Sequence, residues 1–210
     1  MVDVAVIGAA GYSGIETVRW VLGHPSLRLT AATSGADAGK RLDAVYPALV
    51  GRTDAVFTEP DVDAIASAAT VALLAVPHTA AMAMAPALLE RGVTVVDLSA
   101  DFRLTDAAVY EAWYGVPHAA ADLLASAVYG LPELTRDALT GARLVACPGC
   151  YPTATALAAL PVLEAGLVVG ERGIVDAKSG VSGAGRSATA ATPFCSADEA
   201  LAPYQGGRPP

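Results

Sequence analysis

A cysteine that follows a Pro-Gly turn and opens a predicted helix stands where a nucleophile is well placed. The segment Val145–Thr153 ends an apolar strand, turns, and continues into a stretch rich in Ala and Leu from Ala154 to Leu163. The first turn of a helix presents unpaired backbone N–H groups and the positive end of the helix dipole, and both stabilise a thiolate. Pro152 fits this position, because proline is preferred just inside a helix start. Cys150 is therefore our candidate nucleophile.

The same cysteine allows two other interpretations. Cys147 and Cys150 form a C-x-x-C pair, which at a helix start is typical of thioredoxin-like dithiol sites. A free cysteine is also often a small buried apolar residue. Zinc is not expected, because the chain has three cysteines and neither a second C-x-x-C nor a His-x-x-x-His motif to complete four ligands. These residues alone leave nucleophile, redox pair and structural thiol open, and they predict no metal.

A glycine-rich loop near the start of the sequence predicts a dinucleotide-binding site. An apolar strand, Val2–Ile7, runs directly into the motif G-A-A-G-Y-S-G, and a helical stretch from Ile15 to Leu22 follows. Glycines at these spacings allow a tight turn, close approach of the backbone to a pyrophosphate, and close packing of helix on strand. A purely structural glycine turn is the alternative. The loop residues expected to contact the dinucleotide are Gly8, Gly11, Tyr12, Ser13 and Gly14.

The end of the second predicted strand favours NADP over NAD. NAD-binding folds usually carry Asp or Glu after this strand to hold the ribose 2'-hydroxyl, whereas here Leu27–Thr33 is followed by Ser34. No carboxylate stands at that point to repel a 2'-phosphate, and Lys40 and Arg41 lie in the following loop. The pattern therefore indicates NADP, and the alternative is that the two cations are ordinary solvated charges.

Apolar strands alternate with helical segments along the chain. This alternation predicts an α/β fold, namely a doubly wound, Rossmann-type parallel sheet with helices on both faces. Beyond the segments above, we expect strands at Val71–Val76, Val93–Leu98 and Leu144–Cys147, helices at Val62–Ser67, Ala80–Arg91, Asp106–Trp113 and Ala154–Ala165, and a strand of a second domain at Gly173–Ala177.

The composition and charge of the chain argue against some classes of binding partner. The 210 residues are 54% hydrophobic, which is ample for a core, and the net charge is -8. Because no basic stripe is visible, we expect no nucleic-acid or anionic-membrane partner. The uncharged span Ala64–Leu89 is divided by Pro77 and so does not predict a membrane helix. Three cysteines and the lack of a secretory signal fit a cytoplasmic protein.

Six motifs occur in a fixed order along nearly the whole chain. They are Gly8–Gly14 with Ile15-Glu16, Val76–His78, Asp97–Arg103, Tyr129–Glu133, Cys147–Thr153 and Ser179–Arg186. On these residues the chain resembles the N-acetyl-gamma-glutamyl-phosphate reductases, the NADP-dependent enzymes of arginine biosynthesis. The runs D-L-S-A-D-F-R and P-G-C-Y-P-T are the specific ones, whereas glycine loops are common to many dehydrogenases.

The resemblance implies reversible, NADP-dependent reductive dephosphorylation of N-acetyl-glutamyl 5-phosphate to the 5-semialdehyde. The Cys150 thiolate would attack the acyl phosphate and expel phosphate, leaving a thioester that accepts hydride. The resemblance also implies a cofactor domain at residues 1–147, the first part of an α+β substrate and dimerisation domain at 148–210, and a homo-oligomer at full length. Further cofactor contacts are expected at Ser34, Pro77, His78, Ser182, Gly183 and Gly185, and substrate contacts at Arg103 and Arg186.

The chain departs from the family pattern in two respects. Gly35 stands where relatives commonly carry an arginine for the 2'-phosphate. The catalytic histidine of the family lies in an H-R-H-like motif further along, and the histidines present here are His24, His78 and His118. We therefore expect a part of a longer enzyme that binds NADP weakly and turns over slowly. The alternatives are an acyl-phosphate reductase like aspartate-semialdehyde dehydrogenase, a dithiol redox module, and a non-catalytic NADP-binding fragment.

Overall fold

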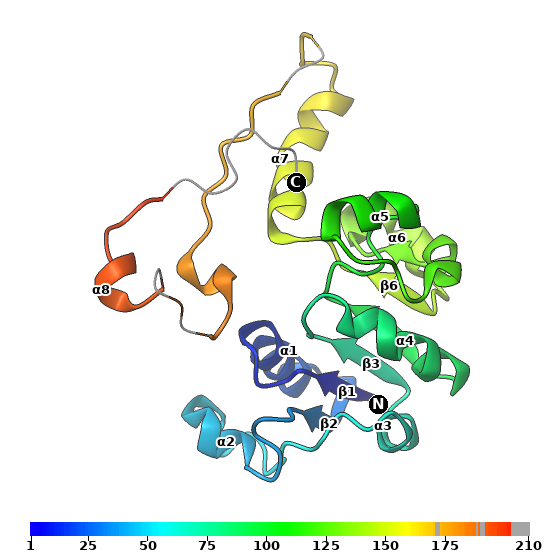
Figure 1. Cartoon of the computed structure of the whole chain (residues 1–210), viewed down its shortest axis with the longest axis vertical. Helices are drawn as coiled ribbons and strands as arrows, with labels where there is room; N and C mark the ends of the chain where they lie inside the picture. Colours follow the sequence, from blue (N-terminus) through cyan, green and yellow to red (C-terminus); the bar gives the residue numbers. More distant parts are fainter. Residues whose placement is uncertain (171–172, 188, 190–191, 203–210) are drawn as a thin grey trace. The chain divides into compact units, whose positions relative to one another are not determined.

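The computed structural model describes residues 1–170, 173–187, 189 and 192–202 (Figure 1). The chain divides into two compact units, Met1–Val175 and Asp176–Pro210. In the first unit the strands are β1 (Val2–Ile7), β2 (Leu27–Thr33), β3 (Val71–Leu74), β4 (Thr94–Asp97), β5 (Val128–Tyr129) and β6 (Leu144–Ala146). Its helices are α1 (Tyr12–Gly23), α2 (Leu42–Val45), η1 (Pro47–Leu49), α3 (Val62–Ala68), α4 (Ala80–Glu90), α5 (Ala107–Tyr114), η2 (Ala121–Ser126), α6 (Pro132–Leu139) and α7 (Cys150–Glu164). The second unit contains η3 (Val181–Ala184) and α8 (Phe194–Ala197).

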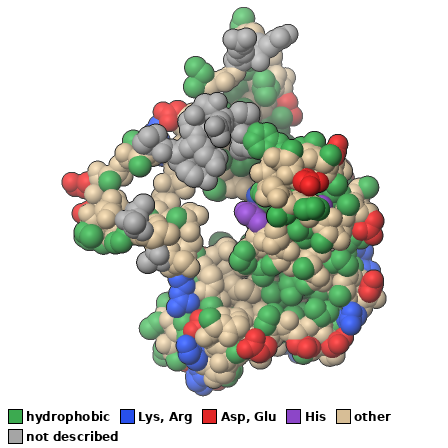
Figure 2. Space-filling view, viewed as in Figure 1, with side chains coloured by type: hydrophobic (Ala, Val, Ile, Leu, Met, Phe, Trp, Pro, Cys, Tyr) green, Lys and Arg blue, Asp and Glu red, His purple; other side chains and the backbone are tan. Residues whose placement is uncertain are grey.

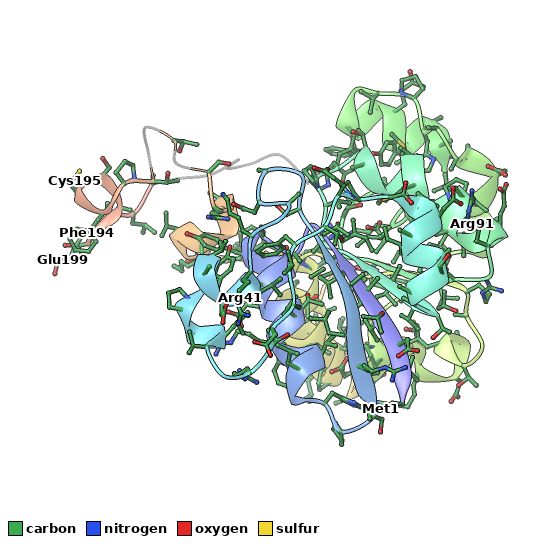
Figure 3. All side chains as sticks on the ribbon, turned by 90° about the horizontal axis from the view of Figure 1, so that it is seen from below. Met1, Arg41, Arg91, Phe194, Cys195 and Glu199 are labelled. Carbon is green, nitrogen blue, oxygen red and sulfur yellow. The ribbon has the colours of Figure 1, made fainter. Side chains whose placement is uncertain are left out.

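The six strands of the first unit form one parallel sheet in the order β2-β1-β3-β4-β6-β5. Side chains alternate between its two faces. Along β1, Val4 and Val6 belong to the core beneath α1 and α2, and Ala5 and Ile7 belong to the core beneath α3 and α4. Arg41 and Arg91 accordingly lie on opposite sides of the strands (Figure 3). The predicted doubly wound α/β fold is confirmed.

The strand order reverses beside β1, because the chain adds β2 on one side of it and β3 on the other. In open parallel sheets, ligands bind outside the carboxyl ends of the strands at such a reversal. Two loops meet at this point. Gly8, after β1, has φ +77°, and a Cβ built on it would lie 2.3 Å from the carbonyl oxygen of Ala75, after β3. The two backbones are therefore in direct contact at the predicted cofactor edge.

Helix α1 begins three residues earlier than the sequence pattern suggested. Gly11 is extended (φ -75°, ψ 167°) and forms the N-cap, so Tyr12, Ser13 and Gly14 already belong to the first turn. Gly14 packs on the preceding loop, since a Cβ built there would lie 2.1 Å from the carbonyl oxygen of Gly8. The glycine spacing thus brings the start of α1 against the end of β1.

The predicted strand at Gly173–Ala177 is wrong. These residues are irregular, and Ile174 is 98% exposed. A strand needs a neighbouring strand for its backbone hydrogen bonds, and none of the described residues pairs with this segment. The short strand β5 and the helix α6 were not predicted. Strand β5 has two residues, too few to show a period, and α6 contains Thr135, whose backbone is not helical.

The contact between Gly14 and Gly8 gives a prediction for stability. Gly14→Ala should lower the free energy of unfolding by about 2 kcal/mol, because the added methyl group meets backbone atoms that cannot rotate away. Gly23→Ala is the matched control at the other end of α1. The nearest atom to its Cβ is 3.9 Å away, in the Arg52 side chain, and this variant should be neutral or gain about 0.5 kcal/mol of helix propensity. Urea unfolding of both variants tests this, and an equal loss in the two would contradict it.

Candidate active site

The N-terminus of α1 faces the edge of the sheet where the strand order reverses. Gly11 has no side chain to cap the helix, so the N–H groups of the first turn are available to an anion. Tyr12 and Ser13 are exposed. The Tyr46 hydroxyl donates to the carbonyl of Ala10 at 2.5 Å and holds the loop from the side of α2. A glycine loop with an open helix N-terminus fits the pyrophosphate of a dinucleotide.

The loop after β2 corrects the sequence argument about the ribose edge. Ser34 accepts a hydrogen bond from the backbone N–H of Asp37 at 3.3 Å. Asp37 is nearly buried, and its carboxylate accepts from the Lys40 ammonium at 2.8 Å. A carboxylate therefore does lie close to Ser34, with a lysine held on it. Arg41 is exposed and forms surface ion pairs with Asp43 and Asp54.

The loop after β3 carries Pro77 and His78, both exposed. The Nδ1 atom of His78 accepts a hydrogen bond from the backbone N–H of Ala100 at 3.2 Å, and its ring lies 5.5 Å from that of Tyr114. A neutral imidazole whose Nδ1 accepts carries its proton on Nε2. His78 thus presents a donor in the loop after β3, the strand next to β1.

Cys150 is exposed and is the first residue of α7, with Gly149 as the N-cap. Cys147 differs, because it is half-buried at the end of β6 and its N–H donates to the carbonyl of Asp97 at 2.8 Å. Burial, reinforced by the Asp97 carboxylate, raises the pKa of Cys147 to about 11. A thiol with that pKa is protonated at neutral pH and unreactive. The environments of the two thiols favour Cys150 as nucleophile over a dithiol pair.

Arg103 braces the turn that presents Cys150. Its Nε donates to the carbonyl of Cys147 at 2.7 Å, and its Nη2 donates to the carbonyl of Leu98 at 3.0 Å. Its Nη1 lies 3.2 Å from a Cβ built on Gly149. A planar guanidinium is suited to such a fork between two chain segments. A substrate role for Arg103 stays a prediction, and these contacts show a positioning role that residue type alone does not reveal.

The residues before Arg103 form a buried polar network that sequence reasoning missed. Asp97 accepts hydrogen bonds from the N–H and the hydroxyl of Ser99, both at 2.8 Å. Both side chains are shielded from solvent. Burial raises the pKa of Asp97, and the Ser99 hydrogen bonds oppose that shift. The sequence feature that could have indicated this network is the pair Asp97 and Asp101, two aspartates in a largely apolar segment at the end of a buried strand.

Two of the three histidines have structural roles. The Nε2 atom of His118 lies 2.7 Å from the carbonyl of Asp101, and its Nδ1 accepts from the N–H of Ala120 at 3.1 Å, so both ring nitrogens are engaged. His24 follows α1, and its Nδ1 accepts from the N–H of Ser26. Of the three, His78 is the one next to the cofactor loops.

The remaining predicted site residues belong to the second unit. They surround η3, where the N–H of Gly183 donates to the carbonyl of Gly180 and that of Gly185, with φ +88°, donates to the carbonyl of Ser182. The cofactor role of Ser182, Gly183 and Gly185 and the substrate role of Arg186 stay predictions.

The described ranges offer neither a candidate metal site nor a candidate membrane span. No group of three or more His, Cys, Asp or Glu there could hold a metal ion. No helix in this part of the chain is both long and apolar enough to cross a bilayer. On the face seen in Figure 2, Lys and Arg form small separate groups among acidic side chains.

Two domain families match successive parts of the chain. Residues 3–142 match the NAD binding domain of semialdehyde dehydrogenase, and residues 150–208 match the semialdehyde dehydrogenase dimerisation domain. The chain belongs to the semialdehyde dehydrogenase family. The second match begins at Cys150, so the candidate nucleophile stands where one family domain gives way to the next.

Curated relatives support the resemblance seen in the sequence. The N-acetyl-gamma-glutamyl-phosphate reductase of Halorhodospira halophila is 54% identical over 97% of this chain and 59% of its own length. The enzyme of the same name from Nitrosococcus oceani is 50% identical over 97% of this chain and 60% of its own length. The chain thus spans about 60% of the length of the curated relatives it matches.

Solved structures support the fold alone. Aspartate semialdehyde dehydrogenase with NADP from Candida albicans aligns with a TM-score of 0.55 at 17% identity, covering 79% of this chain and 47% of that chain. Aspartate semialdehyde dehydrogenase II complexed with ASA from Vibrio cholerae aligns with the same score at 21% identity over the same shares of the two chains.

The contrast between the cysteines predicts their reactivity. At neutral pH, iodoacetamide should label Cys150 fastest, since the fifteen residues of α7 give a stronger dipole than the four of α8, which carries the exposed Cys195. Cys147 should label only as the pH approaches about 11, because the thiolate is the reactive form. Peptide mapping by mass spectrometry measures all three sites, with Cys195 as the internal reference. Labelling of Cys147 at the rate of Cys150 at neutral pH would contradict the assignment.

Proposed function

We propose that this chain supplies the cofactor site and the nucleophile of an N-acetyl-gamma-glutamyl-phosphate reductase. The reaction is NADP-dependent reduction of N-acetyl-glutamyl 5-phosphate to the 5-semialdehyde, with release of phosphate, in arginine biosynthesis. The observation that carries the proposal is the exposed Cys150 heading α7 after β6, at the same edge of the sheet as the Gly8 and His78 loops. The relatives at about half identity support the choice of substrate.

The residues account for both halves of this reaction. The Cys150 thiolate attacks the acyl carbon, the bond from that carbon to the phosphate oxygen breaks, and phosphate leaves with its electron pair, giving a thioester on Cys150. When bound, NADPH supplies the hydride that converts the thioester to the aldehyde and frees the thiolate. The N–H groups that open α7 are placed to stabilise the oxyanion formed at each step. A cysteine therefore serves as nucleophile first and as leaving group afterwards.

Charge complementarity supports two substrate contacts. Arg103 is fixed beside Gly149 with its Nη1 toward the cysteine turn, so it is suited to the phosphate of the substrate. Arg186, in the Ser-Gly loop, is proposed for the carboxylate of the substrate.

We further propose a boundary between a cofactor domain at 1–147 and a catalytic domain from 148. The dimerisation-domain match supports a homo-oligomer, and the biosynthetic role supports a cytoplasmic location.

The ribose edge predicts the cofactor preference. NADPH should bind about tenfold more tightly than NADH, because the exposed ammonium of Lys40, although paired with Asp37, can also make one charge-assisted contact with the 2'-phosphate. Lys40→Ala should reduce this ratio. Arg19→Ala, which removes a surface cation paired with Glu16 on α1, should leave it unchanged. Fluorescence titration of each protein with both nucleotides measures the ratio, and tighter binding of NADH to the unmodified chain would overturn the preference.

Covalent trapping tests the proposed chemistry. With the semialdehyde and NADP but no phosphate, Cys150 adds to the aldehyde and loss of hydride leaves a thioester that lacks its acceptor. Mass spectrometry should then find the acyl group on the Cys150 peptide, with a matching amount of NADPH, and later addition of phosphate should release it. Cys150→Ser should abolish the adduct and Cys147→Ser should retain it. Equal loss in both variants would favour a dithiol mechanism instead.

A further inference from the structure

Asp101 is a fully buried residue whose carboxyl group accepts hydrogen bonds from a different loop, the turn between β3 and α4. Its Oδ1 accepts from the backbone N–H of Thr79 and its Oδ2 from that of Met82, both at 2.9 Å, and the Tyr110 hydroxyl donates to Oδ1 at 2.9 Å. No Lys or Arg of the described residues forms an ion pair with it. Its two oxygens are satisfied by these donors, two of which come from the start of α4.

The two backbone donors show what Asp101 does for α4. Thr79 is the N-cap of this helix, but its own side chain makes no capping hydrogen bond. A capping side chain normally accepts from the third residue of the helix. That residue is Met82, and Asp101 accepts its N–H from outside the helix. Asp101 therefore acts as the missing N-cap and ties down the turn between β3 and α4.

The tied turn is under backbone strain. Thr79 has φ +73°, a left-handed conformation that is unfavourable for a β-branched residue. Such conformations persist where surrounding contacts hold them, and they cluster at functional loops. Thr79 directly follows His78, and Ala75, four residues before it, touches Gly8. Fixing Thr79 thus fixes the side of the cofactor edge formed by β3.

We infer that Asp101 is a positioning residue for the dinucleotide: by capping α4 it holds Thr79 left-handed and fixes the loop after β3, which carries His78 and contacts Gly8 through Ala75. Asp101 touches neither nucleotide nor substrate and acts through the loop. This inference rests on the proposed cofactor site. It also gives a role to the second aspartate of the D-L-S-A-D-F-R run, distinct from the role of Arg103 at the cysteine turn.

The test is NADPH binding by the whole chain carrying Asp101→Asn. The amide has nearly the shape of the carboxylate but presents one donor to the two N–H groups, so the dissociation constant for NADPH should rise about tenfold. Adding Thr79→Gly should recover part of the affinity, because glycine adopts positive φ without cost. Urea unfolding of the same variants separates out a merely structural role, in which stability falls while the folded protein keeps its affinity for NADPH. Full affinity in Asp101→Asn, or no recovery in the double variant, would overturn the inference.

Asp61→Ala is the matched control for loss of a helix cap. Asp61 caps α3 by accepting from the N–H of Ala64 at 2.7 Å, so its removal lowers stability and should leave NADPH affinity unchanged. If unmodified protein fails to bind NADPH, the proposed function and this inference both fail, whereas equal binding by Asp101→Asn and unmodified protein removes the inference alone.

Amide exchange in the unmodified protein gives a second test, which stands even if Asp101→Asn does not fold. The N–H of Thr79 should be protected although its side chain is exposed. Rapid exchange at Thr79 and Met82 would overturn the inference.

Discussion

A buried chain of hydrogen bonds, from Asp97 through Ser99 to Asp101, fixes the loop after β4. The Ser99 hydroxyl donates to Asp97 at 2.8 Å and accepts from the N–H of Asp101 at 3.1 Å. Two residues of this loop make contacts with other loops. Asp101 holds the turn after β3, and Arg103 holds the turn after β6. The two halves of the proposed site, the loop after β3 and the Cys150 turn, are therefore tied to one segment between them.

Two aspartates at the centre of a sheet edge need strong compensation, because an isolated buried charge is very unfavourable. Here the compensation is made of donors: backbone N–H groups and the hydroxyls of Ser99 and Tyr110. No buried side-chain polar atom among the described residues lacks a partner. Compensation by backbone donors is directional, so it fixes loop geometry in a way that a flexible surface ion pair would not.

Much of this arrangement could be predicted from the sequence, because its signals are local. The central strand β1 and the edge strand β2 both fall where predicted, because each is a short, largely apolar segment bounded by turn residues. The placement of Cys150 depends on a Pro-Gly turn and a following helix, which are also local. The capping of α4 by Asp101 could not be predicted, since its partners lie 19 and 22 residues away. The strand predicted at Gly173–Ala177 was wrong for the same reason, because whether a segment forms a strand depends on a neighbouring strand that can lie far away in the sequence.

The hydrogen bond from Arg103 to Cys147 has a consequence for the order in which parts of the chain fold during synthesis. It spans 44 residues, whereas the bonds from Asp101 to the turn after β3 span 19 and 22. Loop closure costs more entropy as the loop lengthens, and the ribosome releases the chain from its N-terminus. The hydrogen bonds that hold the turn after β3 thus join residues within the first 101, whereas the hydrogen bond that holds the cysteine turn needs residue 147. The turn after β3 can therefore form in a growing chain before the cysteine turn does, and a ligand that binds only the folded form of the first turn would stabilise it in the meantime.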